Sequence, residues 1–110
     1  MSGKMKNIEK SKVLVLAEEI EYQQGQVVSK TLIQNNAVSL TLFAFEKDEE
    51  ISTHESGGDA MVTVLDGTGR ITIDGEVFAV ECGQTIVMPA KTPHAVYGQE
   101  RFKMLLTVVF

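Results

Sequence analysis

The chain has 110 residues, of which 44% are hydrophobic and 23% are charged, and its formal net charge is -5. This length favours one domain around a single hydrophobic core, and the apolar content excludes a disordered chain. The acidic balance, with the lysines and arginines scattered, excludes the basic surface that nucleic acids require, so no nucleic-acid partner is expected.

The first ten residues are polar and are expected to form a flexible N-terminal segment, followed by one domain over residues 11–110. The start of the chain lacks the apolar stretch of a signal peptide. No apolar run approaches the ~18 residues that a membrane span needs. The single cysteine, Cys82, excludes an intrachain disulfide and is expected to be a small apolar filler at a turn. These features predict a cytoplasmic protein with no membrane partner.

Short apolar runs with a period of two residues, rich in Val, Ile, Thr and Phe, alternate with turn residues. The expected strands are Lys12–Ala17, Val27–Gln34, Ala37–Phe45, Ala60–Asp66, Gly69–Asp74, Glu76–Val80, Gln84–Pro89, His94–Gly98 and Arg101–Phe110. Residues 46–50 form a charged run that is typical of a solvated loop or a strand edge. Roughly nine or ten short strands with regular turns predict an all-β sandwich or closed barrel.

Two of the turns have a specific signal. Asp74-Gly75 separates two alternating runs and predicts a type I′ hairpin, because both central residues of that turn need positive φ. Asn35-Asn36 also predicts a tight turn, since asparagine tolerates the left-handed conformation.

The stretch from Gly83 to Gly98, GQTIVMPAKTPHAVYG, resembles the second motif of the cupin family, G-x5-P-x-G-x2-H-x3-N. Gly83, Pro89 and His94 stand at motif positions with the expected spacing. Lys91 replaces the usual glycine and Gly98 the usual asparagine. The resemblance implies a single jelly-roll β-barrel, also described as a double-stranded β-helix.

An upstream stretch, DEEISTHESGGDAMVTVLDG, is similar to the first cupin motif, G-x5-H-x-H-x3,4-E-x6-G. His54 matches the first histidine and Gly67 the closing glycine. Asp48 replaces the opening glycine, Ser56 the second histidine and Ala60 the glutamate. The order of the two motifs and the hairpin between them support the same fold.

A typical cupin holds a divalent metal with three histidines and one carboxylate, and the resemblance implies that site on the inner face of the barrel. This chain keeps only His54 and His94 of that set. Asp59 lies one residue from the lost glutamate, where strand alternation turns it away unless the preceding glycines form a bulge. In one interpretation these residues hold Zn, Fe, Mn or Ni weakly. In the other, the histidines are polar groups of a mostly apolar cavity without a metal.

Alternation from His54 predicts which side chains line the barrel. The expected ligand pocket comprises His54, Ser56, Ala60, Val62, Val64, Ile71, Ile73, Met88 and His94, with Met61 and Met104 as further candidates. Plain core packing is the competing explanation for each apolar member. A small pocket with apolar walls and few polar groups is typical of a small-molecule site.

Three functions are consistent with these residues. The first is binding of a small, partly apolar molecule inside the barrel, with His54 and His94 at its mouth and little or no catalysis. The second is a metal-dependent enzyme of the dioxygenase, isomerase or decarboxylase type, as the resemblance implies. The third is a structural or sensor subunit that acts through a dimer interface. A homodimer is expected in each case, since two-fold pairing is the commonest assembly.

Overall fold

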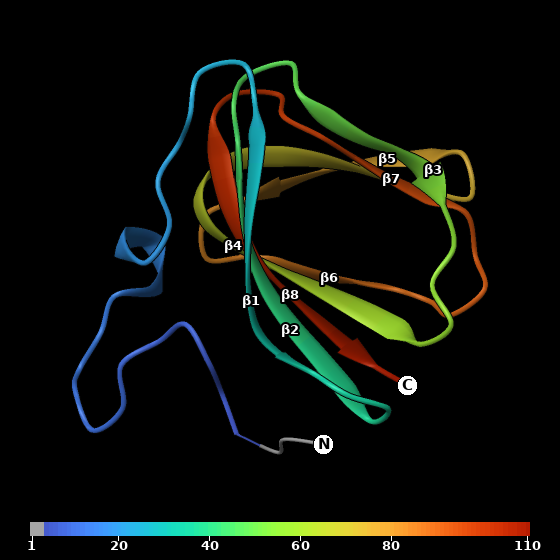
Figure 1. Cartoon of the computed structure of the whole chain (residues 1–110). Helices are drawn as coiled ribbons and strands as arrows, with labels where there is room; N and C mark the ends of the chain where they lie inside the picture. Colours follow the sequence, from blue (N-terminus) through green and yellow to red (C-terminus); the bar gives the residue numbers. More distant parts are fainter. Residues whose placement is uncertain (1–3) are drawn as a thin grey trace.

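The computed structural model describes residues 4–110, which fold almost entirely into strands (Figure 1). The strands are β1 (Val27–Gln34), β2 (Val38–Phe45), β3 (Glu50–His54), β4 (Asp59–Ile73), β5 (Glu76–Glu81), β6 (Thr85–Met88), β7 (His94–Tyr97) and β8 (Phe102–Val109). One short 3-10 turn, η1 (Leu16–Glu18), precedes them. The predicted all-β class is therefore confirmed. Within residues 4–110 there is no helix with the length and apolar character that a membrane crossing requires.

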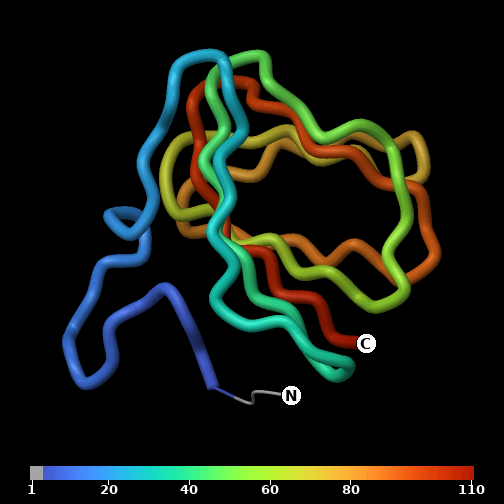
Figure 2. Tube along the Cα trace, in the orientation of Figure 1, coloured from blue at the N-terminus to red at the C-terminus, as the bar shows by residue number. Residues whose placement is uncertain are grey.

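The strands form two antiparallel sheets that face each other as the walls of a barrel (Figures 1 and 2). The first sheet has the order β1-β2-β8-β4-β6, and the second has the order β5-β4-β7-β3. Strand β4 belongs to both sheets and so connects the walls. The buried inner faces of the two sheets pack against each other, as expected for a sandwich or barrel. The site described below lies between them.

Strand β4 passes from the first sheet to the second at Gly67. Its φ is 68°, and a Cβ atom there would lie 2.0 Å from the carbonyl oxygen of Arg101. Only glycine meets both conditions without strain. The sequence predicted two strands here, Ala60–Asp66 and Gly69–Asp74, and that separation is wrong. A glycine with positive φ bends the strand without ending its hydrogen-bonded pairing. The residue that signals a turn in the sequence therefore forms a corner of the barrel.

The hairpin between β4 and β5 is confirmed. Asp74 and Gly75 have φ values of 49° and 85°, and Ile73 pairs with Glu76 across them. The turn between β1 and β2 also forms, but by a different mechanism from the one expected. Neither Asn35 nor Asn36 has positive φ. Instead, Oδ1 of Asn35 accepts hydrogen bonds from the backbone N–H groups of residues 37 and 38.

The strand predicted at Lys12–Ala17 is wrong, because this segment runs into η1 and pairs with no sheet. It lies outside the barrel, beside β1 (Figure 1). Of its apolar residues, Leu16 joins a second hydrophobic cluster on the outer face of the first sheet, around Leu32 and Leu42, whereas Val13 and Val15 are exposed. Ile8 and Tyr22, on either side of the segment, belong to the same cluster. The backbone N–H of Lys6 donates to the carbonyl of Leu32 at 2.7 Å. Residues 1–3 of the predicted flexible segment lie outside the described residues.

Cys82 does not fill the core as expected. It is exposed, and its Sγ donates to the carbonyl oxygen of Leu65 at 3.3 Å. The turn that holds it stands at the edge of the barrel, where no apolar gap needs filling.

Candidate functional site

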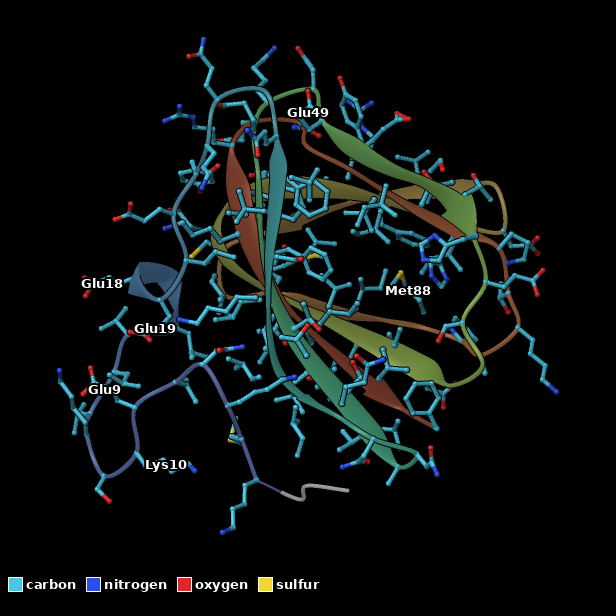
Figure 3. All side chains as sticks on the ribbon, in the orientation of Figure 1. Glu9, Lys10, Glu18, Glu19, Glu49 and Met88 are labelled. Carbon is cyan, nitrogen blue, oxygen red and sulfur yellow. The ribbon has the colours of Figure 1, made fainter. Side chains whose placement is uncertain are left out.

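A cavity of about 220 Å³ lies between the two sheets. It is lined by Phe43, Ile51, His54, Glu55, Ser56, Ala60, Met88, His94, Val96, Met104, Leu106 and Val108. Figure 3 shows Met88 extending from β6 into the interior of the barrel. Most of these side chains are apolar, and the polar ones come from the end of β3, the loop after it and the start of β7. The cavity therefore has apolar walls and one polar end.

A bulge in β3 directs His54 into the cavity. Ile51 is the register partner of Val96, but the next pair is His54 with His94, so β3 uses three residues where β7 uses two. One extra residue reverses the alternation of side chains. Ile51 and His54 therefore both line the cavity, although regular alternation would place them on opposite faces. The polar end depends on this irregularity.

The two histidine rings meet directly. Their Nε2 atoms are 3.2 Å apart, and the ring centroids are 4.4 Å apart at an interplanar angle of 77°. His94 is only 2% exposed, whereas His54 is exposed at the mouth. Nδ1 of His54 lies 2.8 Å from the carbonyl oxygen of Ser52, within the bulge. The same bulge therefore orients the ring that it turns inward.

His94 has an unsatisfied polar atom. Its Nδ1 is buried and has no hydrogen-bond partner. Burial lowers the pKa of His94 below its usual value, and the neighbouring His54 lowers it further, while the Thr92 backbone and Glu55 act in the opposite direction. Thr92 does not complete a hydrogen bond with Nδ1. The neutral imidazole is the form that this environment favours.

The residues of the predicted pocket occupy two levels of the barrel. His54, Ser56, Ala60, Met88 and His94 line the cavity. Val62, Val64, Ile71 and Ile73 also point inward along β4 but belong to the packed core beside it, outside the lining. Of the further candidates, Met104 lines the cavity and Met61 is exposed on the outer face of the first sheet.

Several lining residues were not predicted. Ile51 and Glu55 were missed because the bulge in β3 leaves no period-two signal. Leu106 and Val108 were also missed, although they share the parity of Met104 on β8, which was already a candidate. For Val96 a signal was present, since it lies two residues from His94 and must share its face.

The donor set does not fit the metal site that the resemblance implies. Ser56 and Ala60 line the cavity where that site needs a histidine and a carboxylate. Oδ1 of Asp59 is occupied as the acceptor for the backbone N–H of Ala90, at 2.9 Å, and holds the loop after β6. Within residues 4–110, no three His, Cys, Asp or Glu side chains are grouped to hold an ion. Two imidazoles fall short of the three protein ligands usual in catalytic sites.

Comparison with known proteins agrees with this architecture. Residues 41–110 match the family described as "Cupin domain". A conserved protein of unknown function from Streptococcus pyogenes is 51% identical, with a TM-score of 0.94 over 99% of this chain and 95% of that one. A cupin superfamily protein from Desulfitobacterium hafniense is 33% identical, with a TM-score of 0.93 over 98% of this chain and 99% of that one.

A shorter match involves an uncharacterized protein of Methanocaldococcus jannaschii. The two are 48% identical over 33 residues, which is 30% of this chain and only 26% of that protein. This match alone would not establish a relationship over the whole barrel. The family match covers well over half of the chain, however, and the solved structures cover nearly all of it. The chain belongs to the cupin family.

Proposed function

We propose that this protein binds one small, partly apolar molecule in the cavity between its two sheets. The lining carries the proposal: apolar side chains surround the space, and a single polar end is formed by His54 and His94. Few polar groups in an apolar pocket provide orientation, and the apolar walls provide most of the binding energy. The volume of about 220 Å³ lies below the range usual for drug-sized ligands, so the molecule is small.

The lining contains no lysine or arginine, and its one carboxylate, on Glu55, is exposed. A ligand with a strong permanent charge would therefore lose its hydration without gaining a fixed counter-ion. Hydrogen bonding to the two imidazoles, with the Ser56 hydroxyl beside them, is the interaction that the cavity offers. The primary role is accordingly recognition, and the acid–base chemistry that these side chains supply is proton transfer by a histidine or by Glu55 at the mouth.

Filling the cavity tests this function. Ala60 is 1% exposed and lines the cavity, so Ala60→Leu would occupy ligand space. The matched control is Ala79→Leu, on the exposed face of β5. Small, uncharged, partly apolar molecules, amides and ketones among them, are screened by the rise in melting temperature that binding produces. We expect a compound that stabilises the native chain and Ala79→Leu but not Ala60→Leu. Equal stabilisation of both variants would place binding elsewhere, and no stabilisation by any compound would refute the proposal.

One observation favours a second candidate, a metal-dependent enzyme of the dioxygenase, isomerase or decarboxylase type. The two Nε2 atoms face each other at 3.2 Å, close enough for one ion to contact both. Elemental analysis of protein purified without a metal-affinity step decides between the candidates. Near-stoichiometric Zn, Fe, Mn or Ni, lost in His54→Ala, would support the enzyme.

A further inference from the structure

We infer that the polar end of the cavity selects ligands with a hydrogen-bond donor and an acceptor on neighbouring atoms, as in a carboxamide or a neutral carboxylic acid. This inference rests on the proposed function and names its ligand class. It follows from the hydrogen-bond chain that begins in the β3 bulge, passes through His54 and ends at His94.

The first step concerns the proton on His54. A carbonyl oxygen only accepts hydrogen bonds, so the contact of 2.8 Å between Nδ1 of His54 and the Ser52 carbonyl requires an N–H at Nδ1. In the neutral ring the proton then resides there, and Nε2 carries a free lone pair. That lone pair points along the line to His94, at 3.2 Å.

The second step concerns His94. Because Nε2 of His54 is an acceptor, the Nε2 atom of His94 must be the donor, and Nδ1 of His94 must carry the lone pair. The buried Nδ1 atom completes no hydrogen bond, although the Thr92 backbone lies near enough to raise the pKa of His94. A buried acceptor without a partner is tolerated more often than a buried N–H without one, so the orphaned atom agrees with this tautomer.

The pair therefore offers a ligand one acceptor, on His54, and one donor, on His94. A carboxamide supplies the complementary N–H and C=O groups, so two hydrogen bonds replace the single bond between the rings. An ester or ketone has only acceptors and leaves the His54 lone pair unmatched. A carboxylate also has only acceptors, and no lysine or arginine in the lining compensates its charge. Glu55, at the mouth, adds a further acceptor and disfavours anions.

Matched probes test the selection: benzamide, methyl benzoate, sodium benzoate and toluene, with isobutyramide as a smaller amide. Dissociation constants are measured by calorimetry at neutral pH, with melting temperature as a second readout. We expect an amide to bind about tenfold more tightly than methyl benzoate, the factor that corresponds to one added hydrogen bond. In His54→Phe the preference should fall to about twofold or less, whereas Glu76→Gln, at an exposed position of β5 outside the cavity, should retain it.

The outcomes separate the two proposals. If neither amide nor toluene binds, the proposed function fails and this inference fails with it. If methyl benzoate or toluene binds as tightly as the amides, the cavity binds ligands but the donor–acceptor selection is refuted. Tighter binding of benzoate than of benzamide would also refute it. Nitrogen-detected NMR of the imidazoles gives an independent readout, and a proton on Nδ1 of neutral His94 would contradict the assigned tautomers.

Discussion

His54 and His94 are register partners on β3 and β7, and an extra residue in β3 is what brings their Nε2 atoms within 3.2 Å of each other. Without the bulge, alternation from Ile51 would direct Thr53 inward and His54 outward. The polar end of the cavity is thus a property of local strand geometry. The contact between the rings should also be measurable as an energetic coupling.

A double-mutant cycle measures that coupling. His54→Ala leaves the buried N–H of His94 without its partner, and we expect the free energy of unfolding to fall by about 1–3 kcal/mol. Once His94 is also alanine, the loss of His54 should matter less, with a coupling of roughly 0.5–2 kcal/mol. Urea denaturation of the four proteins gives both quantities. Strictly additive losses would show that the rings do not interact.

Stability should also depend on pH through His94. Burial and His54 hold the pKa of His94 below its usual 6.5 in the folded state. At a pH between the lowered pKa of the folded state and 6.5, the unfolded chain binds the proton and the folded chain does not. The free energy of unfolding therefore falls as the pH falls through this window. We expect a lower melting temperature at pH ~5.5 than at pH ~7.5, with a smaller difference in His94→Leu.

Two carboxylates provide a control for this pH dependence. Arg101 lowers the pKa of Glu46, and Tyr97 lowers that of Asp48, so both lose their stabilising contribution in more acidic solution, below their ordinary values of 4.5 and 3.8. Glu46→Gln should leave the difference between pH ~5.5 and ~7.5 unchanged. If it removes the difference instead, the assignment to His94 is wrong.

The sequence predicted the fold well because its strongest signals are local. Asp74-Gly75 specifies its hairpin through the φ values that it tolerates, and the spacing of Gly83, Pro89 and His94 carries the family motif. A glycine signal alone does not distinguish a turn from a strand corner, however. Gly67 resembles a turn residue in the sequence, and only its contact with the Arg101 backbone shows that the strand continues.

The site was less predictable because it depends on contacts between distant segments. The bulge in β3 is defined by its register with β7, forty or more residues away, and leaves no periodic trace in residues 50–54. The Lys12–Ala17 segment has a strand pattern, but a strand forms only where a neighbouring strand pairs with it, and none of the described strands pairs with this segment. Of its apolar residues, Leu16 packs instead on the outer face around Leu32 and Leu42, while Val13 and Val15 stay exposed.

Restoring the missing ligands should create a metal site. Ser56 and Ala60 line the same cavity as the two histidines, at the positions where the family motif has a histidine and a glutamate. Three imidazoles and one carboxylate suit a divalent ion such as Zn, Ni or Mn. We expect Ser56→His with Ala60→Glu to bind close to one equivalent by elemental analysis, and the native chain far less. Adding His54→Ala should abolish this gain in bound metal. A native chain that already binds one equivalent of metal would contradict the conclusion that its own residues do not fit the site.

Two glycines provide a matched comparison of backbone constraint. Gly67 and Gly75 have φ values of 68° and 85°, so alanine at either is strained by about 1–2 kcal/mol. Only at Gly67 would the added Cβ meet backbone, 2.0 Å from the Arg101 carbonyl oxygen, whereas nothing lies within 4 Å at Gly75. Gly67→Ala should therefore cost roughly a further 1–3 kcal/mol in urea denaturation. Equal losses would show that β4 turns its corner without this contact.

Self-association should involve the outer face of the first sheet. Met61 and Val87 are register partners there, with exposures of 38% and 50%, and Val109 lies on the adjacent strand β8. The N-terminal segment covers another part of this face and leaves these residues open. We expect a homodimer in sedimentation velocity that Val87→Glu dissociates, because a charge in an apolar interface loses its hydration. Val77→Glu, on the equally apolar but separate strand β5, should leave the dimer intact. A chain that stays monomeric at high concentration, or a dimer that only Val77→Glu disrupts, would exclude this face as the interface.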